Sequence, residues 1–557
     1  MNNNLDNPYY YLENFRFVLA WVLQRYADLL EPDEVDFIKE FSGVSIRSQA
    51  LLVRMVMRRG NLFRAGKLVY QEIGDSHDAA RSLIAHGWIT MDPLISVDQL
   101  HGLLTKKEFA QALQLHEDKG AKKADLLELA QAVLHEPRRF SEWWVNSGDA
   151  LYEVCVADVC DRIRLMFFGN LYQDWSEFVL ADLGIFAYEK VAFSEASRAF
   201  HERRDIDIYL HLHACRERLQ DGDALPDIER DINAIACIND CTNPWLQGRR
   251  AKLLFQIGQE YERIGDNASA LRIYARCDYP GARLRHVRVL EKGDQPAAAL
   301  ALAEVAVAAP ESAEEQQHLA RIMPRLQRKC GLARPGTRLK MPVPRIDLVI
   351  PRPSEDLRVE EAARRHIEQL ERTSQTAPVY YVENTLINSL FGLLCWDAIF
   401  SAVPGAFFHP FQMGPADLHS ANFRAQRADL FHQSLSQLGS QQYQRTIRET
   451  FARKAGIQSP FVYWEVLDKN LLEHALACLP AHHLEKWFQR ILDGIAANRS
   501  GFPDLIQFWP QEKRYRMIEI KGPGDRLQDN QIRFLDFCLE HEMPVAVCYV
   551  EWESESQ

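Results

Sequence analysis

The chain has 557 residues, of which 47% are apolar, and a single core rarely grows beyond ~250–300 residues, so two or more domains are expected. No run of about 18 uncharged apolar residues predicts a membrane span, and residues 1–6 lack the basic start of a secretion signal, so we expect an intracellular protein. The net charge of −12 does not by itself favour nucleic-acid binding, which would depend on local basic patches.

The N-terminal region predicts helices and a basic cluster. Residues 1 to about 40 are expected to be helical, a second helix begins at Ser48, and a third stretch after Gly74 ends at residues 87–89. This order of helix, turn, helix and short strand is compatible with a winged-helix module. An arginine-rich solvated surface explains the charges equally well. The candidate DNA-binding residues are Arg54, Arg58, Arg59 and Lys67.

Two short helices joined by a lysine-rich turn are predicted between about residues 100 and 131. The turn contains Lys119, Gly120, Lys122 and Lys123, which would place ammonium groups and backbone amides together. Such a unit suits contacts with phosphate groups. The pattern resembles the SAP-type DNA-binding motif, so these three lysines are further candidates for DNA contacts.

Residues from about 140 to 330 predict a continuous helical region. The turns Gly265-Asp266 and Gly293-Asp294 lie 28 residues apart, and small residues follow each turn. This resembles tetratricopeptide pairs, although their period is ~34 residues, so a degenerate array is expected. Such arrays form concave surfaces that bind protein partners, but helix packing alone explains the pattern equally well. Residues 333–353 alternate prolines with basic residues and predict a connector.

The segment between Gly501 and Leu539 carries the clearest chemical pattern. Residues 503–508 predict a strand, residues 509–514 a polar hairpin connection, and residues 515–521 the return strand. The sharp turn at residues 522–524 then precedes an amphipathic helix. The order of these elements predicts a hairpin followed by a covering helix.

Three polar residues of this hairpin form a plausible catalytic set. Glu519 and Lys521 share one face of their strand, because side chains alternate, and a hairpin can bring Asp504 close to Glu519. Two neighbouring carboxylates repel each other unless a divalent cation binds both. Such a cation activates water and stabilises charge on phosphate oxygens. Lys521 can orient that water or stabilise the transition state.

Alternating Glu and Lys residues also occur on exposed strands, so this spacing alone leaves a surface strand open. The pattern continues from Glu519 to Leu535 as Glu-Ile-Lys-Gly-Pro-Gly-Asp-Arg-Leu-Gln-Asp-Asn-Gln-Ile-Arg-Phe-Leu. This run closely resembles the virus-type replication-repair nuclease domain of the PD-(D/E)XK superfamily, as found in the Fanconi-associated nuclease family. The order of a helical N-terminal region, a SAP-like motif, tetratricopeptide-like helices and a nuclease agrees with that family.

The resemblance also implies metal ligands outside this pattern. The family takes a glutamate from an upstream helix, and the matching residue is Glu383; the backbone carbonyl of Ile520 is a further implied ligand. By its own spacing, Glu383 lies on a predicted helical stripe with Leu386, Ile387 and Leu390. A carboxylate there is costly unless it is paired or metal-bound, although a glutamate at the stripe's edge is the plain alternative.

The resemblance implies a structure-specific DNA nuclease that depends on Mg²⁺ or Mn²⁺. Its implied activities are 5′-flap endonuclease and 5′-to-3′ exonuclease, a phosphodiesterase I type reaction that leaves 5′-phosphorylated products in interstrand crosslink repair. Glu383, Asp504 and Glu519 would hold the metal and Lys521 would assist the attacking water. The alternatives are an inactive helical-repeat scaffold, against which the intact acidic and lysine set argues, and an RNA-directed nuclease.

The expected architecture is mostly α-helical in its N-terminal and middle regions, with a C-terminal α/β nuclease domain. The predicted boundaries are residues 1–135 for the DNA-binding region, 136–345 for the helical array and 346–557 for the nuclease domain.

Overall fold

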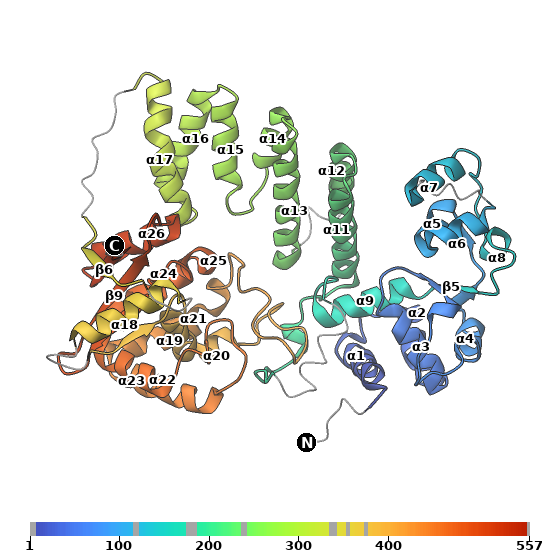
Figure 1. Ribbon diagram of the computed structural model, residues 1–557, viewed down its shortest axis with the longest axis horizontal. Helices are drawn as coiled ribbons and strands as arrows, with labels where there is room; N and C mark the ends of the chain where they lie inside the picture. The colour runs from blue at the N-terminus through green and yellow to red at the C-terminus, as the bar shows by residue number, and fades with distance from the viewer. Residues whose placement is uncertain are drawn as a thin grey trace. The chain divides into compact units, whose positions relative to one another are not determined.

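The chain divides into two units in the structure, a computed structural model (Figure 1). The first unit comprises residues 1–186 and 200–206, and the second comprises residues 187–199 and 207–557. In the part of the chain that the structure describes, no helix combines the length and apolarity that a membrane crossing needs. The described residues are 7–114, 122–173, 186–234, 242–332, 342–352, 357–371 and 377–553. Lys119 therefore lies outside them.

The first unit surrounds a small antiparallel sheet with helices. Strand β5 lies between β1 and β2, and β3 pairs with β4 separately. The expectation of continuous helix from residue 140 is therefore wrong at β5, where Tyr152 and Val154 suit a half-buried strand and the neighbouring strands bond its backbone. The strands are β1 (Leu62–Arg64), β2 (Ile89–Met91), β3 (Leu94–Ile95), β4 (Arg138–Arg139) and β5 (Leu151–Val154). The helices are α1 (Tyr10–Tyr26), α2 (Pro32–Phe41), α3 (Ile46–Val56), α4 (Ser76–Ala85), α5 (Val97–Leu103), α6 (Lys106–Ala112), α7 (Lys123–Gln131), α8 (Phe140–Trp143) and α9 (Ala157–Phe168).

The predicted pair of short helices after residue 100 forms a compact subregion. Capping boxes begin two of its helices: Ser96 and Gln99 bond reciprocally before α5, and Thr105 and Glu108 do so before α6. The apolar sides of α5, α6, α7 and α8 share one core that includes Phe109. Local capping and this small core explain how short helices remain folded here.

A helical array forms much of the second unit, and its first helix starts within residues 200–206 of the first unit. Its helices are α11 (Arg203–Asp221), α12 (Leu225–Ala234), α13 (Pro244–Arg263), α14 (Asn267–Tyr274), α15 (Ala282–Lys292), α16 (Pro296–Ala308) and α17 (Ala313–Lys329). Helices α13 to α17 follow one another side by side (Figure 1). Asp266 caps α14 by accepting a bond from the Ser269 amide at 3.0 Å. A Cβ at Gly258 would lie 2.6 Å from the Tyr274 ring, so the close contact between α13 and α14 requires glycine there.

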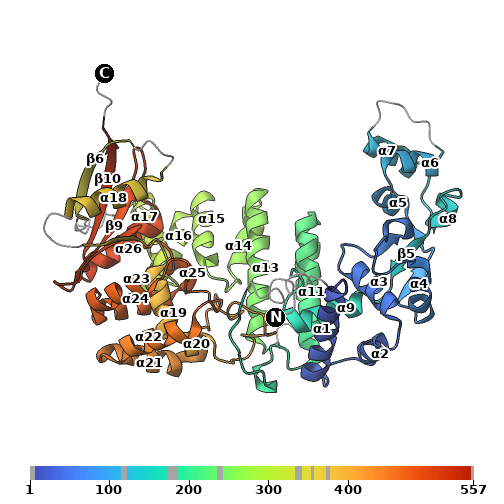
Figure 2. The same ribbon diagram turned by 60° about the horizontal axis from the view of Figure 1, so that its bottom comes forward.

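The last part of the second unit is built on a mixed five-stranded sheet in the order β6-β10-β9-β8-β7. Figure 2 labels three of these strands, β6, β10 and β9. Strands β6 and β9 run parallel to β10, while β7 to β9 are antiparallel neighbours. The strands are β6 (Arg345–Ile350), β7 (Val379–Tyr381), β8 (Leu505–Trp509), β9 (Arg514–Lys521) and β10 (Val545–Trp552). The helices are α18 (Val359–Glu371), α19 (Leu386–Leu394), α20 (Trp396–Ile399), α21 (Ala428–Ser436), α22 (Gln442–Lys454), α23 (Lys469–Cys478), α24 (Ala481–Asp493), α25 (Ile495–Asn498) and α26 (Asp529–Glu540).

Strand β6 corrects the prediction that residues 333–353 form only a connector. It pairs with β10 over six residues, from Arg345 opposite Val547 to Ile350 opposite Trp552. The prolines at positions 344 and 351 flank this edge strand and do not interrupt it, so each of its amides remains available.

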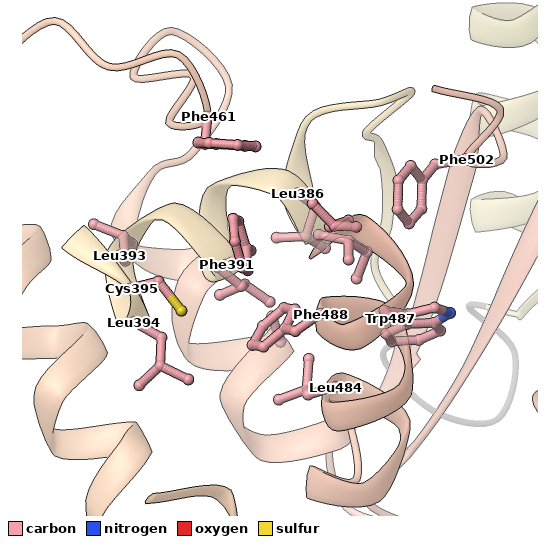
Figure 3. Close-up of a cluster of buried hydrophobic side chains, with 14 of the residues drawn as sticks. Leu386, Phe391, Leu393, Leu394, Cys395, Phe461, Leu484, Trp487, Phe488 and Phe502 are labelled. Carbon is pink, nitrogen blue, oxygen red and sulfur yellow. The ribbon is translucent and has the colours of Figure 1, made fainter. Parts of the chain in front are cut away.

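Two apolar cores cover the two faces of this sheet. Leu505, Ile518 and Ile520 pack toward α18, while Ile506 and Met517 belong to a larger core with α19, α23, α24 and α26. Figure 3 shows part of this larger core, where side chains of α19 meet those of α24. The rings of Phe391 and Phe488 lie 5.6 Å apart there, in an edge-on arrangement. These cores fix the strands that carry the candidate site.

A segment from far upstream also belongs to this last region. Residues 187–199 lie in the second unit, and Ala187 forms a parallel bridge with Ile457. The carboxylate of Glu189 accepts hydrogen bonds from Lys454 at 2.6 Å and from the Trp396 indole at 2.9 Å. The nuclease-like region is therefore assembled from two stretches of chain.

Candidate active site

The hairpin of β8 and β9 places the predicted carboxylates opposite each other. Leu505 pairs with Ile518, so the next position outward sets Asp504 against Glu519. Lys521 follows on the same face of β9 as Glu519. The three side chains are buried, with exposed fractions of 6% for Asp504, 1% for Glu519 and 7% for Lys521. An exposed charged strand, the alternative reading of the pattern, is excluded by this burial.

Hydrogen bonds hold one oxygen of each carboxylate. Asp504 Oδ2 accepts the Ile520 amide at 2.8 Å. Glu519 Oε1 accepts the Lys521 ammonium at 2.8 Å and the Gln531 amide of α26 at 2.6 Å. Among the described residues, Asp504 Oδ1 and Glu519 Oε2 have no hydrogen-bond partner. Each carboxylate thus keeps one oxygen available for a ligand.

Burial raises the pKa of both carboxylates. For Asp504, the nearby charges of Glu383 and Glu360 raise the pKa further, while the Ile520 amide and Lys521 oppose this shift. For Glu519, the charge of Asp504 adds to burial, and Lys521 opposes it. One lysine does not balance the buried negative charge, so the pair is electrostatically prepared for an added cation.

The structure corrects the expected position of Glu383. It lies in a turn between β7 and α19, not on the apolar stripe of a helix. The chain cannot be helical there because Asn384 adopts a φ of +52° and α19 begins only at Leu386. The turn is fixed by the Val382 amide, which donates to the Asp504 carbonyl at 2.8 Å. Glu383 therefore stands beside the acidic pair for a reason that helical spacing did not reveal.

Two residues of the site were missed as contributors from the sequence. Gln531, in the first turn of α26, donates a hydrogen bond to Glu519, although no sequence pattern assigned it a role in the site. The Tyr381 hydroxyl donates to Glu383 Oε2 at 2.5 Å, and burial together with the Glu383 charge raises the pKa of that hydroxyl. Tyr381 lies two residues before Glu383 and ends β7, the strand that pairs with β8.

The donor chemistry of the site fits a hard divalent cation. The available atoms are carboxylate oxygens, which Mg²⁺, Mn²⁺ and Ca²⁺ prefer over sulfur or imidazole ligands. Within the described residues, no three His, Cys, Asp or Glu side chains gather closely enough to form a metal site by themselves. The prepared pair is Asp504 and Glu519, and Glu383, bonded to Tyr381, would have to turn to join it.

The raised pKa values predict an unusual stability profile. Because the folded protein binds protons on Asp504 and Glu519 that the unfolded chain has already lost, the metal-free protein should lose stability as pH rises from about 4 to about 7. In Glu519→Gln, we expect the decrease in the free energy of unfolding between these pH values to be smaller by about 2 kcal/mol. Denaturant unfolding in EDTA at pH 4.5 and pH 7.5 measures the effect. Equal pH slopes for the two proteins would contradict it.

The predicted DNA-binding residues differ in their surroundings. Arg58, Arg59, Lys67 and Lys122 are exposed. By contrast, the Arg54 guanidinium donates to Glu72 at 2.7 Å and lies over the Tyr11 ring, so it holds the fold together, and Lys123 donates to the His101 carbonyl. Arg54 and Lys123 thus already have partners within the protein, whereas the other four side chains are open to solvent. All six residues stay predicted DNA contacts.

Comparison with family models identifies three parts of the chain. Residues 9–90 match the model described as FAN1, HTH domain, and residues 94–143 match the Fanconi anemia-associated nuclease SAP domain. Residues 438–552 match the VRR-NUC domain, which contains Asp504, Glu519 and Lys521. A nuclease domain of this type implies dependence on a divalent metal ion. The carboxylate oxygens of the site are donors that such an ion prefers.

Similarity to known relatives extends over nearly the whole of this chain. The chain is 53% identical to the Fanconi-associated nuclease 1 homolog of Pseudomonas aeruginosa, covering 98% of this chain and 97% of that protein. It is 24% identical to the Arabidopsis thaliana homolog over 97% of this chain and 67% of that protein. A crystal structure described as paFAN1 bound to 2nt 5′flap DNA with gap matches with a TM-score of 0.88 and 53% identity, covering 99% of each chain. With this identity along its whole length, the chain belongs to the Fanconi-associated nuclease family and is a nuclease of DNA repair.

Proposed function

We propose that this protein cleaves branched DNA with a 5′ flap, as a metal-dependent phosphodiesterase whose active site is Asp504, Glu519, Lys521 and Glu383. The observation that carries the proposal is the buried acidic pair with one available oxygen on each carboxylate. Support for the substrate comes from two matching crystal structures, described as paFAN1 bound to 5′ flap DNA with gap. Both share 53% identity with this chain.

Each side chain has a distinct role in this proposal. Asp504 and Glu519 would hold Mg²⁺ or Mn²⁺ together with Glu383 and the Ile520 carbonyl, and the bound ion supplies an activated water and charge stabilisation on phosphate. Lys521, held by Glu519 at 2.8 Å, would orient the attacking water and neutralise charge that develops on the phosphate. Gln531 would keep Glu519 Oε1 in place, which leaves Oε2 for the ion.

In the proposed reaction, water attacks the phosphorus atom and the bond between phosphorus and the 3′ oxygen breaks. One product carries a 5′ phosphate and the other a 3′ hydroxyl. This reaction would serve 5′-flap incision and 5′-to-3′ trimming during interstrand crosslink repair. The alternative, an inactive scaffold that only binds DNA or protein, gives no reason for two neighbouring buried carboxylates whose pKa values are both raised. Such a costly arrangement is typical of sites that act on a ligand.

Duplex DNA would be held by the exposed basic residues of the first unit. Arg59 and Lys67 are exposed, and within the described residues neither forms an ion pair with a carboxylate. We expect the Arg59→Ala/Lys67→Ala double variant to bind flap DNA more weakly and to lower the slope of log affinity against log salt by about 2. Fluorescence anisotropy at several salt concentrations measures both quantities.

Arg81→Ala is the matched control for this pair. Arg81 is also an exposed cation of the first unit, but it pairs with Asp78 within α4 at 3.0 Å. Its loss should leave the salt slope unchanged. If the double variant behaves like Arg81→Ala, these residues do not contact DNA.

The proposed function is tested with end-labelled 5′-flap, 3′-flap, duplex and single-stranded DNA in Mg²⁺, Mn²⁺ or EDTA. We expect cleavage near the junction of the 5′ flap, none in EDTA, and products that a ligase joins because they carry a 5′ phosphate. Cleavage that prefers the 3′ flap would overturn the polarity. Binding without cleavage of any substrate would favour the scaffold.

A further inference from the structure

The last helix of the array holds the first turn of the helix that reaches the active site. On α17, Arg321 donates to Asp529 of α26 through two bonds of 2.7 and 2.6 Å. Gln317, one turn earlier, donates to the Asp529 carbonyl at 3.1 Å and accepts from Arg533 at 2.7 Å. The main chain and the side chain of the first residue of α26 are therefore both bonded to α17.

The same turn of α26 carries the bond to the acidic pair. Gln531 donates to Glu519 at 2.6 Å, and its Oε1 accepts the Gln528 amide at 2.8 Å in the capping box that begins the helix. The first turn of α26 also packs tightly against Gly501, where a Cβ would lie 2.7 Å from the Asn530 carbonyl oxygen. A shift of this turn would consequently carry Gln531 away from Glu519.

Helix α17 can fix the position of α26 relative to the array, because two of its sides contact different helices. Leu319, Ile322 and Leu326 are buried in a core shared with α15 and α16. Gln317 and Arg321, spaced by one turn on another side, contact α26 instead, as the adjacency of α17 and α26 in Figure 1 shows. The array is thus tied to the active-site helix by polar bonds and to its own helices by apolar packing.

We propose that Arg321 and Gln317 are positioning residues for the nuclease: they fix the first turn of α26, so that Gln531 holds Glu519 in the orientation that binds the metal. This inference rests on the proposed role of Glu519. Residues that orient a metal ligand typically contribute tenfold or more to metal affinity, and residues one step further out contribute less. The helical array would then contribute to metal binding at the active site by positioning α26.

The test compares two arginines of one helix. Arg321→Glu replaces two bonds to Asp529 with repulsion, and Arg321→Ala only removes the bonds. Arg325→Ala is the control, because Arg325 lies one turn later, is 53% exposed against 49% for Arg321, and makes an equally bidentate pair with Glu291 of α15. Calorimetric titration with Mn²⁺ measures the affinity of each full-length protein, and thermal unfolding verifies that each is folded.

We expect the Mn²⁺ dissociation constant to rise about three- to tenfold in Arg321→Ala, more in Arg321→Glu, and not in Arg325→Ala. DNA affinity in EDTA should stay within about twofold for all three, because no proposed DNA contact changes. Wild-type Mn²⁺ affinity in both Arg321 variants, or an equal loss in Arg325→Ala, would overturn the positioning role. If wild type and Asp504→Asn bind Mn²⁺ alike, the proposed active site fails first.

Discussion

Replacing Asp504 with Asn is expected to lower the rate of flap cleavage on the order of a thousandfold or more, equivalent to about 4 kcal/mol of transition-state stabilisation. The amide oxygen of Asn can still accept the Ile520 N–H bond, so the strand should keep its geometry. What is lost is the negative charge that faces Glu519 and that, in the proposed function, attracts the cation. Single-turnover cleavage with Mn²⁺ measures the effect, and anisotropy in EDTA measures DNA binding, which should be unchanged.

Asp347→Asn serves as the control for this variant. Asp347 lies on β6 of the same sheet, but it is exposed and pairs with Arg345 at 2.7 Å, away from the acidic pair. It should cleave at the wild-type rate. If Asp504→Asn retained more than about a tenth of wild-type activity, Asp504 would not be a metal ligand.

Asp417→Ala is expected to lower the free energy of unfolding by about 3–5 kcal/mol, because it leaves the Arg427 guanidinium buried without its charge partner. Arg427 is 1% exposed and donates to both oxygens of Asp417, at 2.6 and 2.9 Å. It also donates to the Phe423 carbonyl at 3.2 Å and lies over the Phe423 ring. Denaturant unfolding measures the loss.

The double variant Asp417→Ala/Arg427→Leu separates a lost partner from a lost contact. Removing the cation as well should recover part of the stability, since two apolar side chains leave no buried charge. If Asp417→Ala lowered the free energy of unfolding by less than about 1 kcal/mol, the pair would contribute no more than an exposed ion pair does, which would contradict its burial.

The hairpin of the proposed active site was predictable from sequence, because strand alternation and turn residues act over a few neighbouring positions. Side chains alternate along a strand, so the spacing of Glu519 and Lys521 placed them on one face, and the polar connection predicted at residues 509–514 indicated the return of the chain. The structure agrees closely, with β8 ending at Trp509 and β9 beginning at Arg514. The resemblance to a nuclease family added the roles that the spacing alone left open.

Features that depend on distant contacts were not predictable in the same way. Strand β5 forms because β1 and β2 bond its two edges, and β6 forms because β10 pairs with it. Glu383 fitted a helical stripe, but the bond from Val382 to Asp504 and the positive φ of Asn384 produce a turn instead. Sequence spacing does not contain the partner strand that decides each case.

The contact between Arg321 and Asp529 is a further example. The two residues are 208 positions apart, and each alone is an ordinary charged residue on a helix. Only the placement of α17 against α26 makes them partners. For the same reason, residue spacing did not indicate that Gln531 donates a hydrogen bond to Glu519.

The central claim, that Lys521 acts with a metal held by the acidic pair, is tested most directly by single-turnover cleavage of an end-labelled 5′-flap DNA by wild type and Lys521→Ala, with Mn²⁺ or EDTA. The account predicts metal-dependent cutting by wild type, a rate lowered at least about a hundredfold in Lys521→Ala, and equal DNA affinities for the two proteins. Cutting by Lys521→Ala at the wild-type rate, or cutting by wild type in EDTA, would contradict it.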